Sequence, residues 1–234
     1  MMIDMHSHCL PLMDDGADSI DTSLEMLRFA KANGTHTVAA TPHYNCTKQS
    51  VDEFLNKREY SYSLIKETVL NAPGVYPKIT FGAEVLLCSD LSEGIDLKKL
   101  CYAGTDYLLI ELNSIYSPST VSEWIYNISI RGFKPIIAHI DRYADHKDIM
   151  QELCGVDVVY QINAARFLGL FSNGAVKDIL KRHDKFIVSS DMHNLTTRSF
   201  NMHIAYNKAK KYAGERLSFM FNDGAAAILN NVTL

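Results

Sequence analysis

Short apolar segments alternate with segments of helical periodicity along the 234 residues of the chain. Alternation of strands and helices is typical of a parallel sheet, and these apolar segments lack the polar alternation of half-exposed strands. We therefore predict an α/β fold, with a closed or nearly closed (β/α) barrel favoured over an open doubly wound sheet. The segments expected to form strands are residues 3–5, 37–41, 78–87, 107–112, 134–139, 156–163 and 185–190.

Helices are expected between these strands. Ser19 and Asp21 can cap the first helix, and Gly34 ends it. No linker or low-complexity segment interrupts the pattern, so residues 1–234 are predicted to form one domain. The absence of a Gly-x-Gly-x-x-Gly motif after the first strand argues against a dinucleotide site. Further helices are expected near residues 51–70, 119–131, 146–154, 174–183, 200–213 and 223–230.

Composition excludes several classes of function. Hydrophobic residues make up 47% of the chain, enough for a sizeable core, and a net charge of −4 without a basic patch argues against nucleic acid as a partner. No apolar run approaches the roughly 18–20 residues of a membrane span, and no signal peptide is recognisable. The five cysteines are scattered without a Cys-x-x-Cys pair. This pattern predicts neither a disulfide framework nor a zinc ribbon, and a reducing cytoplasm is the expected location.

The first expected strand ends in His6-Ser7-His8. Side chains two residues apart in an extended segment point to the same side, so the two imidazoles could hold one metal ion together. A His-x-His pair is weak evidence alone, because such pairs are common on protein surfaces. The pair gains meaning only if other parts of the chain supply matching ligands.

Other strands also end in metal-ligating side chains. The carboxyl ends of parallel strands meet at one rim of a barrel, where active sites of this architecture lie. Residues 156–163 form the exception, because this strand ends in Gln161 and Asn163, which could orient ligands rather than bind metal. The candidate ligands are His6, His8, Asp15, His43, Glu84, Glu111, His139, Asp191 and His193.

Nine candidate ligands are too many for one tetrahedral ion, so two or three ions are expected. Clustered imidazoles and carboxylates suit manganese, iron or zinc. Closely spaced ions can activate a hydroxide at neutral pH and stabilise both oxygens of an in-line phosphoryl displacement. Arg142 and Arg198 lie close in sequence to candidate ligands, and each guanidinium could bind phosphate oxygens as a fork.

Several of these segments resemble the polymerase and histidinol phosphatase (PHP) superfamily. Within it they are most similar to the bacterial metal-dependent protein-tyrosine phosphatases of the CpsB/CapC/YwqE type. The resemblance spans nearly the whole chain in order, although Asp141 stands where this family is expected to have glutamate. The matching segments are residues 2–8, 14–16, 41–43, 82–84, Ala-His-Ile-Asp-Arg-Tyr at 138–143 and Ser-Asp-Met-His-Asn at 190–194.

The resemblance implies a distorted (β/α)7 TIM-like barrel with three divalent metal ions, usually manganese or iron. The first ion would take His6, His8, Glu84 and Asp191. The second would share Glu84 and take Glu111 and His139, and the third would take Asp15, His43 and His193. Arg142 and Arg198 would bind phosphate. The implied substrate is a phosphotyrosine protein, typically the tail of a tyrosine autokinase that controls capsule or exopolysaccharide export.

Three other functions compete with this expectation. A small-molecule phosphatase, such as histidinol phosphatase, would use the same barrel and metals. An amidohydrolase also begins with His-x-His, but such chains often carry a lysine where this one has Glu111. A non-catalytic protein could retain the fold without the activity. A covalent phosphocysteine mechanism is disfavoured, because no cysteine is followed by five residues and then arginine.

Overall fold

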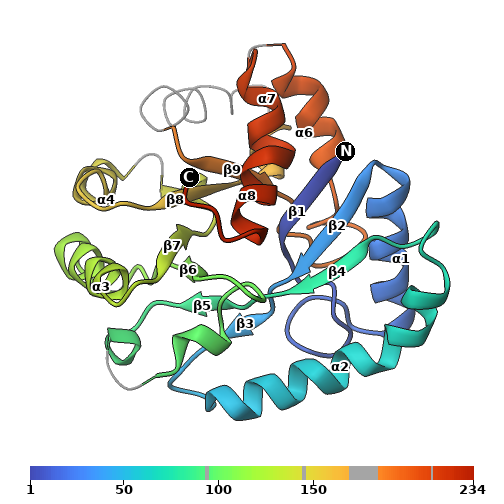
Figure 1. Cartoon of the computed structure of the whole chain (residues 1–234), viewed down its shortest axis with the longest axis horizontal. Helices are drawn as coiled ribbons and strands as arrows, with labels where there is room; N and C mark the ends of the chain where they lie inside the picture. The colour runs from blue at the N-terminus through green and yellow to red at the C-terminus, as the bar shows by residue number, and fades with distance from the viewer. Residues whose placement is uncertain (93–94, 144–145, 169–183, 212) are drawn as a thin grey trace.

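The computed structural model describes residues 1–92, 95–143, 146–168, 184–211 and 213–234 (Figure 1). All strand pairs between its named strands are parallel, and they form two sheets. The first sheet has the order β1 (Met2–Ser7), β2 (Thr35–Ala40) and β4 (Lys78–Phe81). The second has the order β3 (His43–Tyr44), β5 (Glu84–Leu86), β6 (Tyr107–Glu111), β7 (Lys134–Ile137), β8 (Val159–Asn163) and β9 (Phe186–Ser189).

The two sheets approach each other where the first and last strands meet. The backbone N–H of His8 donates to the carbonyl of Met192 at 2.9 Å, and that of Asp191 donates to the carbonyl of His6 at 2.9 Å. These bonds bring the carboxyl end of β1 beside the carboxyl end of β9. The prediction of an α/β fold with parallel sheets is confirmed. Among the described residues, however, the strands form two sheets and not a closed barrel.

Residues 78–87 were expected to form one strand, and this prediction was wrong. They form β4 and β5, which belong to different sheets because β4 pairs with β2 and β5 pairs with β3 and β6. The chain turns at Gly82, where a Cβ would lie 3.0 Å from the ring of Tyr102. Glu84 therefore begins β5 instead of lying near the end of a longer strand.

Helices pack around the outside of the sheets (Figure 1). Ser19 caps the first helix as expected, accepting from the N–H of Thr22, and the structure adds a capping box of Ser50 with Glu53 at the start of the second. The helix expected at residues 174–183 lies outside the described residues. The described helices are α1 (Ile20–Ala32), α2 (Val51–Asn71), α3 (Pro118–Ile130), α4 (Lys147–Leu153), α6 (Met202–Ala209), α7 (Arg216–Ser218) and α8 (Gly224–Leu229), with a π-helical turn, η5 (Phe219–Asp223), before α8.

The hydrophobic core has two parts. The larger cluster lies between the sheets and the helices. The smaller cluster combines side chains from strands of both sheets with Ala225 and Ile228 of α8, so the two sheets share an apolar interior. The buried Tyr102 hydroxyl donates to the carbonyl of Met5 at 2.6 Å across this interior. The strand residues of the smaller cluster are Ile3, Met5, Ala39, Tyr107, Leu109, Ile136, Ala138, Val159 and Ile187.

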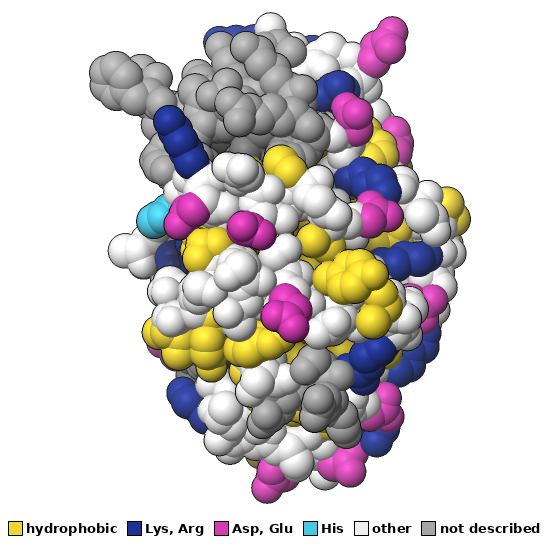
Figure 2. All heavy atoms as spheres, turned by 90° about the vertical axis from the view of Figure 1, so that its left-hand side faces the viewer, with side chains coloured by type: hydrophobic (Ala, Val, Ile, Leu, Met, Phe, Trp, Pro, Cys, Tyr) yellow, Lys and Arg dark blue, Asp and Glu magenta, His cyan; other side chains and the backbone are white. Residues whose placement is uncertain are grey.

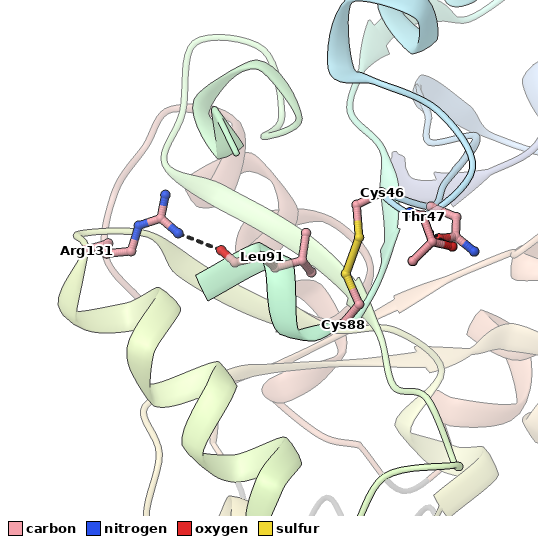
Figure 3. The surroundings of a disulfide bond; sticks show 6 residues. Cys46, Thr47, Cys88, Leu91 and Arg131 are labelled. Atoms are coloured by element: carbon pink, nitrogen blue, oxygen red, sulfur yellow. Dashed lines mark hydrogen bonds between the residues drawn. A yellow bond between two sulfur atoms is a disulfide. The ribbon is translucent and has the colours of Figure 1, made fainter. Parts of the chain in front are cut away.

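Two cysteines are paired, contrary to the expectation that no disulfide forms. Cys46 and Cys88 are joined by a disulfide (Figure 3). They follow β3 and β5, which are neighbours in the second sheet, and His43 is in register with Glu84. The pairing of these strands brings together two cysteines that are 42 residues apart in sequence. No helix in the described part of the chain is both long and apolar enough to span a bilayer.

Candidate metal centre

All nine predicted ligands lie at one end of the two sheets and converge there. Donor atoms of eight of them form three overlapping groups, and within each group the atoms lie within 4.8 Å of one another. His8 and His43 each belong to two groups, so the groups form one continuous cluster. The groups are His6, His8 and Asp191; His8, Asp15, His43 and His193; and His43, Glu84 and Glu111.

His139 falls outside these three groups but contacts the same carboxylates. Its Nε2 atom lies 2.8 Å from Glu84 Oε1 and 3.6 Å from Glu111 Oε1. The position next to Glu84 and Glu111 that was expected for His139 is thus also approached by His43, whose Nδ1 lies 3.1 Å from Glu84 Oε2.

Glu84 is the centre of the cluster. Its Oε2 atom is 3.1 Å from Nε2 of His6 and 3.1 Å from Nε2 of His8, yet it makes no hydrogen bond. The second ring nitrogen of each histidine already has an acceptor: Nδ1 of His6 lies 3.0 Å from Gln161 Oε1, and Nδ1 of His8 lies 2.7 Å from Asp14 Oδ2. In neutral imidazoles so oriented, both Nε2 lone pairs face a carboxylate oxygen. A cation among them satisfies all three atoms.

Two further buried atoms fit a cation. His139 Nδ1 and His193 Nε2 have no hydrogen-bond partner among the described residues. A buried polar atom without a partner is costly, about 1–3 kcal/mol. His193 also has its Nδ1 atom 3.0 Å from the carbonyl of Asp191, and its Nε2 atom lies 3.4 Å from Asp15 Oδ1. The residues present therefore fit divalent ions held by imidazole nitrogen and carboxylate oxygen.

The titratable groups of this cluster influence one another strongly. Burial alone would lower the pKa of His8, but the neighbouring carboxylates of Asp14 and Glu84 raise that pKa to about 10. Burial and the charge of Glu84 raise the pKa of Glu111 to about 7. Asp14 and Glu84 thus favour a proton on His8 when no metal is bound, and a bound ion would take the place of that proton.

The backbone is strained at two candidate ligands. His139 has φ +33° and Asp191 has φ +51°, in a region that residues other than glycine rarely adopt. Such conformations cost about 1–3 kcal/mol each and concentrate at functional sites. Each lies two residues beyond the last residue of its strand, β7 or β9, and the sharp turn there aims its side chain into the cluster. No sequence pattern indicates this strain.

β8 supplies the orienting residues expected from its sequence. Gln161 Oε1 accepts from the backbone N–H of His139 at 2.6 Å in addition to its contact with His6. The Gln161 amide donates to Asn163 at 2.9 Å, and the Asn163 amide donates to Asp191 at 2.8 Å. One buried chain of amides therefore connects candidate ligands on β1, β7 and β9.

Two acidic residues have roles that sequence reasoning missed. Asp14, adjacent to the predicted ligand Asp15, contacts His8 and accepts from the N–H of His43 at 3.0 Å. Asp4 is fully buried and accepts from the backbone N–H of Ser190 at 2.9 Å, which ties β1 to the end of β9. The signals available were the acidic pair before Gly16 and an aspartate inside an apolar strand.

The two arginines lie at the edge of the cluster. Arg142 Nη2 donates to Asp191 Oδ2 at 2.8 Å, and Arg198 Nη2 donates to the same oxygen at 3.0 Å. Arg198 Nη1 also lies 3.5 Å from Asp15 Oδ2. Both guanidinium groups are partly exposed, at 44% and 38%. Each therefore keeps donors that can reach an anion arriving from solvent.

The fold and the site together define an α/β protein of parallel sheets with a His/Asp/Glu centre that could hold metal. Comparison with known proteins identifies its family: residues 2–230 match the family described as "Capsular polysaccharide synthesis, CpsB/CapC". The chain belongs to this family.

Two relatives and one solved structure resemble the chain along most of its length. Tyrosine-protein phosphatase YwqE of Bacillus subtilis is 30% identical, with 100% of this chain and 93% of that protein covered. Putative tyrosine-protein phosphatase CapC of Staphylococcus aureus is 32% identical, with 94% and 89% covered. A solved structure from work on YwqE of Bacillus subtilis and CpsB of Streptococcus pneumoniae, described as "unique metal-dependent tyrosine phosphatases", superposes with a TM-score of 0.81 at 28% identity and covers 100% of this chain and 96% of its own.

Proposed function

We propose that this chain is a metal-dependent protein-tyrosine phosphatase, a hydrolase of phosphate monoesters. The observation that carries the proposal is the convergence of His6 Nε2 and His8 Nε2 on the unpartnered Oε2 of Glu84. The names of its relatives in the CpsB/CapC family support the choice of phosphotyrosine over a small-molecule ester such as histidinol phosphate. The phenolate released from phosphotyrosine, with a pKa of about 10, is a better leaving group than a serine alkoxide.

Three divalent ions are part of the proposal, with manganese favoured and iron or zinc also suited to these ligands. His6, His8, Glu84 and Asp191 would hold the first. Glu84, Glu111 and His139 would hold the second, with His43 close to the same carboxylates, and Asp15, His43 and His193 the third. When bound, such ions supply Lewis acidity to phosphoryl oxygen and to the attacking water.

The protein's own residues prepare the site for a phosphate ester. Asp14 and Gln161 set the tautomers of His8 and His6, so that their Nε2 lone pairs point inward. Arg142 and Arg198 would donate to the phosphate oxygens and offset their charge as the ester bond breaks. Their anchoring on Asp191 positions both guanidinium groups before substrate arrives.

The biological setting is the broader part of the proposal. We infer that the substrate is the phosphotyrosine tail of a tyrosine autokinase in capsule or exopolysaccharide regulation, encountered in the cytoplasm. We also infer that the chain works as one domain and that its two sheets are the halves of a distorted (β/α)7 barrel. The shared apolar interior and the β1–β9 contacts support that arrangement.

One experiment tests the activity and the metal together. The purified protein is stripped with a chelator, reloaded with Mn²⁺, and assayed on a phosphotyrosine peptide, a phosphoserine peptide of the same sequence and histidinol phosphate. We expect about three ions per chain, hydrolysis only after reloading, and a clear preference for the phosphotyrosine peptide. Undiminished activity of the stripped protein would contradict the metal centre. A preference for histidinol phosphate would favour the small-molecule alternative.

A further inference from the structure

A separate pocket lies beside the candidate metal centre. It has a volume of about 230 Å³ and is lined by the segment between β6 and α3, by the first turns of α3 and α4, and by Tyr143 and His146 between β7 and α4. Small-molecule sites usually measure about 300–1,000 Å³. The pocket is therefore sized for a single side chain rather than for an independent ligand.

The chain segments that follow β6 and β7 contribute to both the pocket and the edge of the metal centre. Glu111 immediately precedes Leu112 of the pocket, and Arg142 immediately precedes Tyr143. Arg142 Nη1 lies 4.0 Å from Glu111 Oε1. The hydroxyl of Tyr143 donates to the carbonyl of Leu112 at 2.9 Å and fastens the two segments together. Arg142, which would hold the phosphate, is thus the immediate neighbour in sequence of Tyr143 in the pocket wall.

The pocket is apolar on its buried side, whereas Asn113 and the exposed Ser114, His146 and Asp148 are polar residues of its lining. Leu112, Val121 and Ile149 are buried, and the half-buried rings of Tyr116 and Tyr143 complete the walls. Tyr116 packs edge-on against Trp124 of α3, with ring centroids 4.7 Å apart, so its ring is held in place. The helices behind this pocket, α3 and α4, lie on the side of the molecule shown in Figure 2, where hydrophobic side chains are interspersed with charged ones.

We propose that this pocket receives a large apolar side chain, aliphatic or aromatic, adjacent to the phosphotyrosine of the substrate, and so selects among phosphotyrosine proteins. The inference rests on the proposed phosphatase function, which places the phosphotyrosine at Arg142. The occupant follows from the pocket's apolar walls, its single-side-chain volume and its continuity with the phosphate-binding edge. One buried apolar side chain typically discriminates between substrates by about 10–200-fold.

The test compares two phosphotyrosine peptides that differ only beside the phosphotyrosine, which is flanked on both sides by Leu in one and by Gly in the other. We expect the wild-type protein to favour the Leu peptide by at least about tenfold in kcat/KM, mainly through KM. Ser114→Trp places a bulky ring at the pocket from an exposed position, so folding is not at stake. This variant should hydrolyse both peptides equally and keep its rate on p-nitrophenyl phosphate.

Ser119→Trp is the matched control, because Ser119 is exposed on the same segment but does not line the pocket. It should keep the wild-type preference. Equal wild-type rates on the two peptides, or a preference that survives in Ser114→Trp, would overturn the pocket assignment alone. Failure of the manganese-loaded wild-type protein to hydrolyse both peptides and p-nitrophenyl phosphate would overturn the proposed function and this inference with it.

Discussion

The buried and the exposed halves of the candidate metal centre differ in what their side chains can contact. The side chains of His6, His8, Glu84 and Asp191 are at most 3% exposed, so solvent scarcely reaches them. Asp15, with a side chain 60% exposed, and His43, at 37%, face solvent. Arg142 and Arg198 belong to this exposed half as well.

The difference suggests that the buried half binds metal and the exposed half binds the substrate. In the buried half, the Nε2 atoms of two imidazoles face one carboxylate oxygen, and a bound cation would satisfy all three atoms. In the exposed half, a substrate anion can replace the water molecules or side chains that these residues contact, and the buried core stays intact. Asp191 connects the halves, because one of its oxygens accepts from both arginines while the other lies 3.5 Å from His6 Nε2. Mutations in the two halves should therefore have different signatures.

The largest effect is expected in the buried half. His6→Ala removes a candidate ligand, so bound metal and activity should fall together, with kcat/KM reduced by at least about 10²–10³-fold. Metal content by atomic emission and hydrolysis of a phosphotyrosine peptide check this outcome. His36→Ala, a half-buried histidine outside the cluster, is the matched control and should retain both. Full metal content and full rate in His6→Ala would disprove the assignment.

The exposed half should lose activity without losing metal. Arg198→Ala removes donors to the phosphate while the buried ligands stay in place, so kcat should fall by about 10²-fold. Metal content should equal that of the wild-type protein. Arg28→Ala is the control, since the guanidinium of Arg28 contacts Glu25 and Tyr76, neither of which is a candidate ligand. An unchanged kcat in Arg198→Ala would show that this arginine is only structural.

An intermediate effect is expected for the amide chain behind the buried half. Gln161→Leu keeps the size of the side chain but removes its contacts with His6 and the N–H of His139, so metal affinity should fall by about 10–100-fold. Metal titration followed by calorimetry measures the change. Excess Mn²⁺ should restore much of the rate. The control is Gln151→Leu, on the exposed face of α4, which should bind metal like the wild type. If Gln161→Leu binds metal as tightly as Gln151→Leu does, Gln161 does not orient the ligands.

The smallest effect on catalysis is expected at the disulfide. Cys46 and Cys88 follow β3 and β5 outside the ligand cluster, so Cys88→Ser should change kcat less than about twofold. Alkylation of the denatured wild-type protein should label Cys9, Cys101 and Cys154 without reductant and all five cysteines after reduction. Labelling of five cysteines before reduction would contradict the pairing.

Much of the site could be predicted from the sequence because its pattern is local. Short apolar segments ending in His, Asp or Glu, together with parallel topology, suffice to place nine side chains at one end of the strands. The roles of Gln161 and Asn163 followed from the same argument, because β8 alone carried amides where other strands carried ligands. The resemblance to the CpsB/CapC/YwqE type was confirmed by the family match.

Tertiary structure decided what depends on contacts between distant residues. The division of residues 78–87 into two strands, the approach of His43 to Glu84 and the pairing of Cys46 with Cys88 all arise from strand neighbours that periodicity does not encode. The left-handed backbone at His139 and Asp191 is likewise held by surrounding packing against its local preference. The sequence by itself determined which side chains could bind metal, whereas only the packed sheets determined which of their atoms face one another.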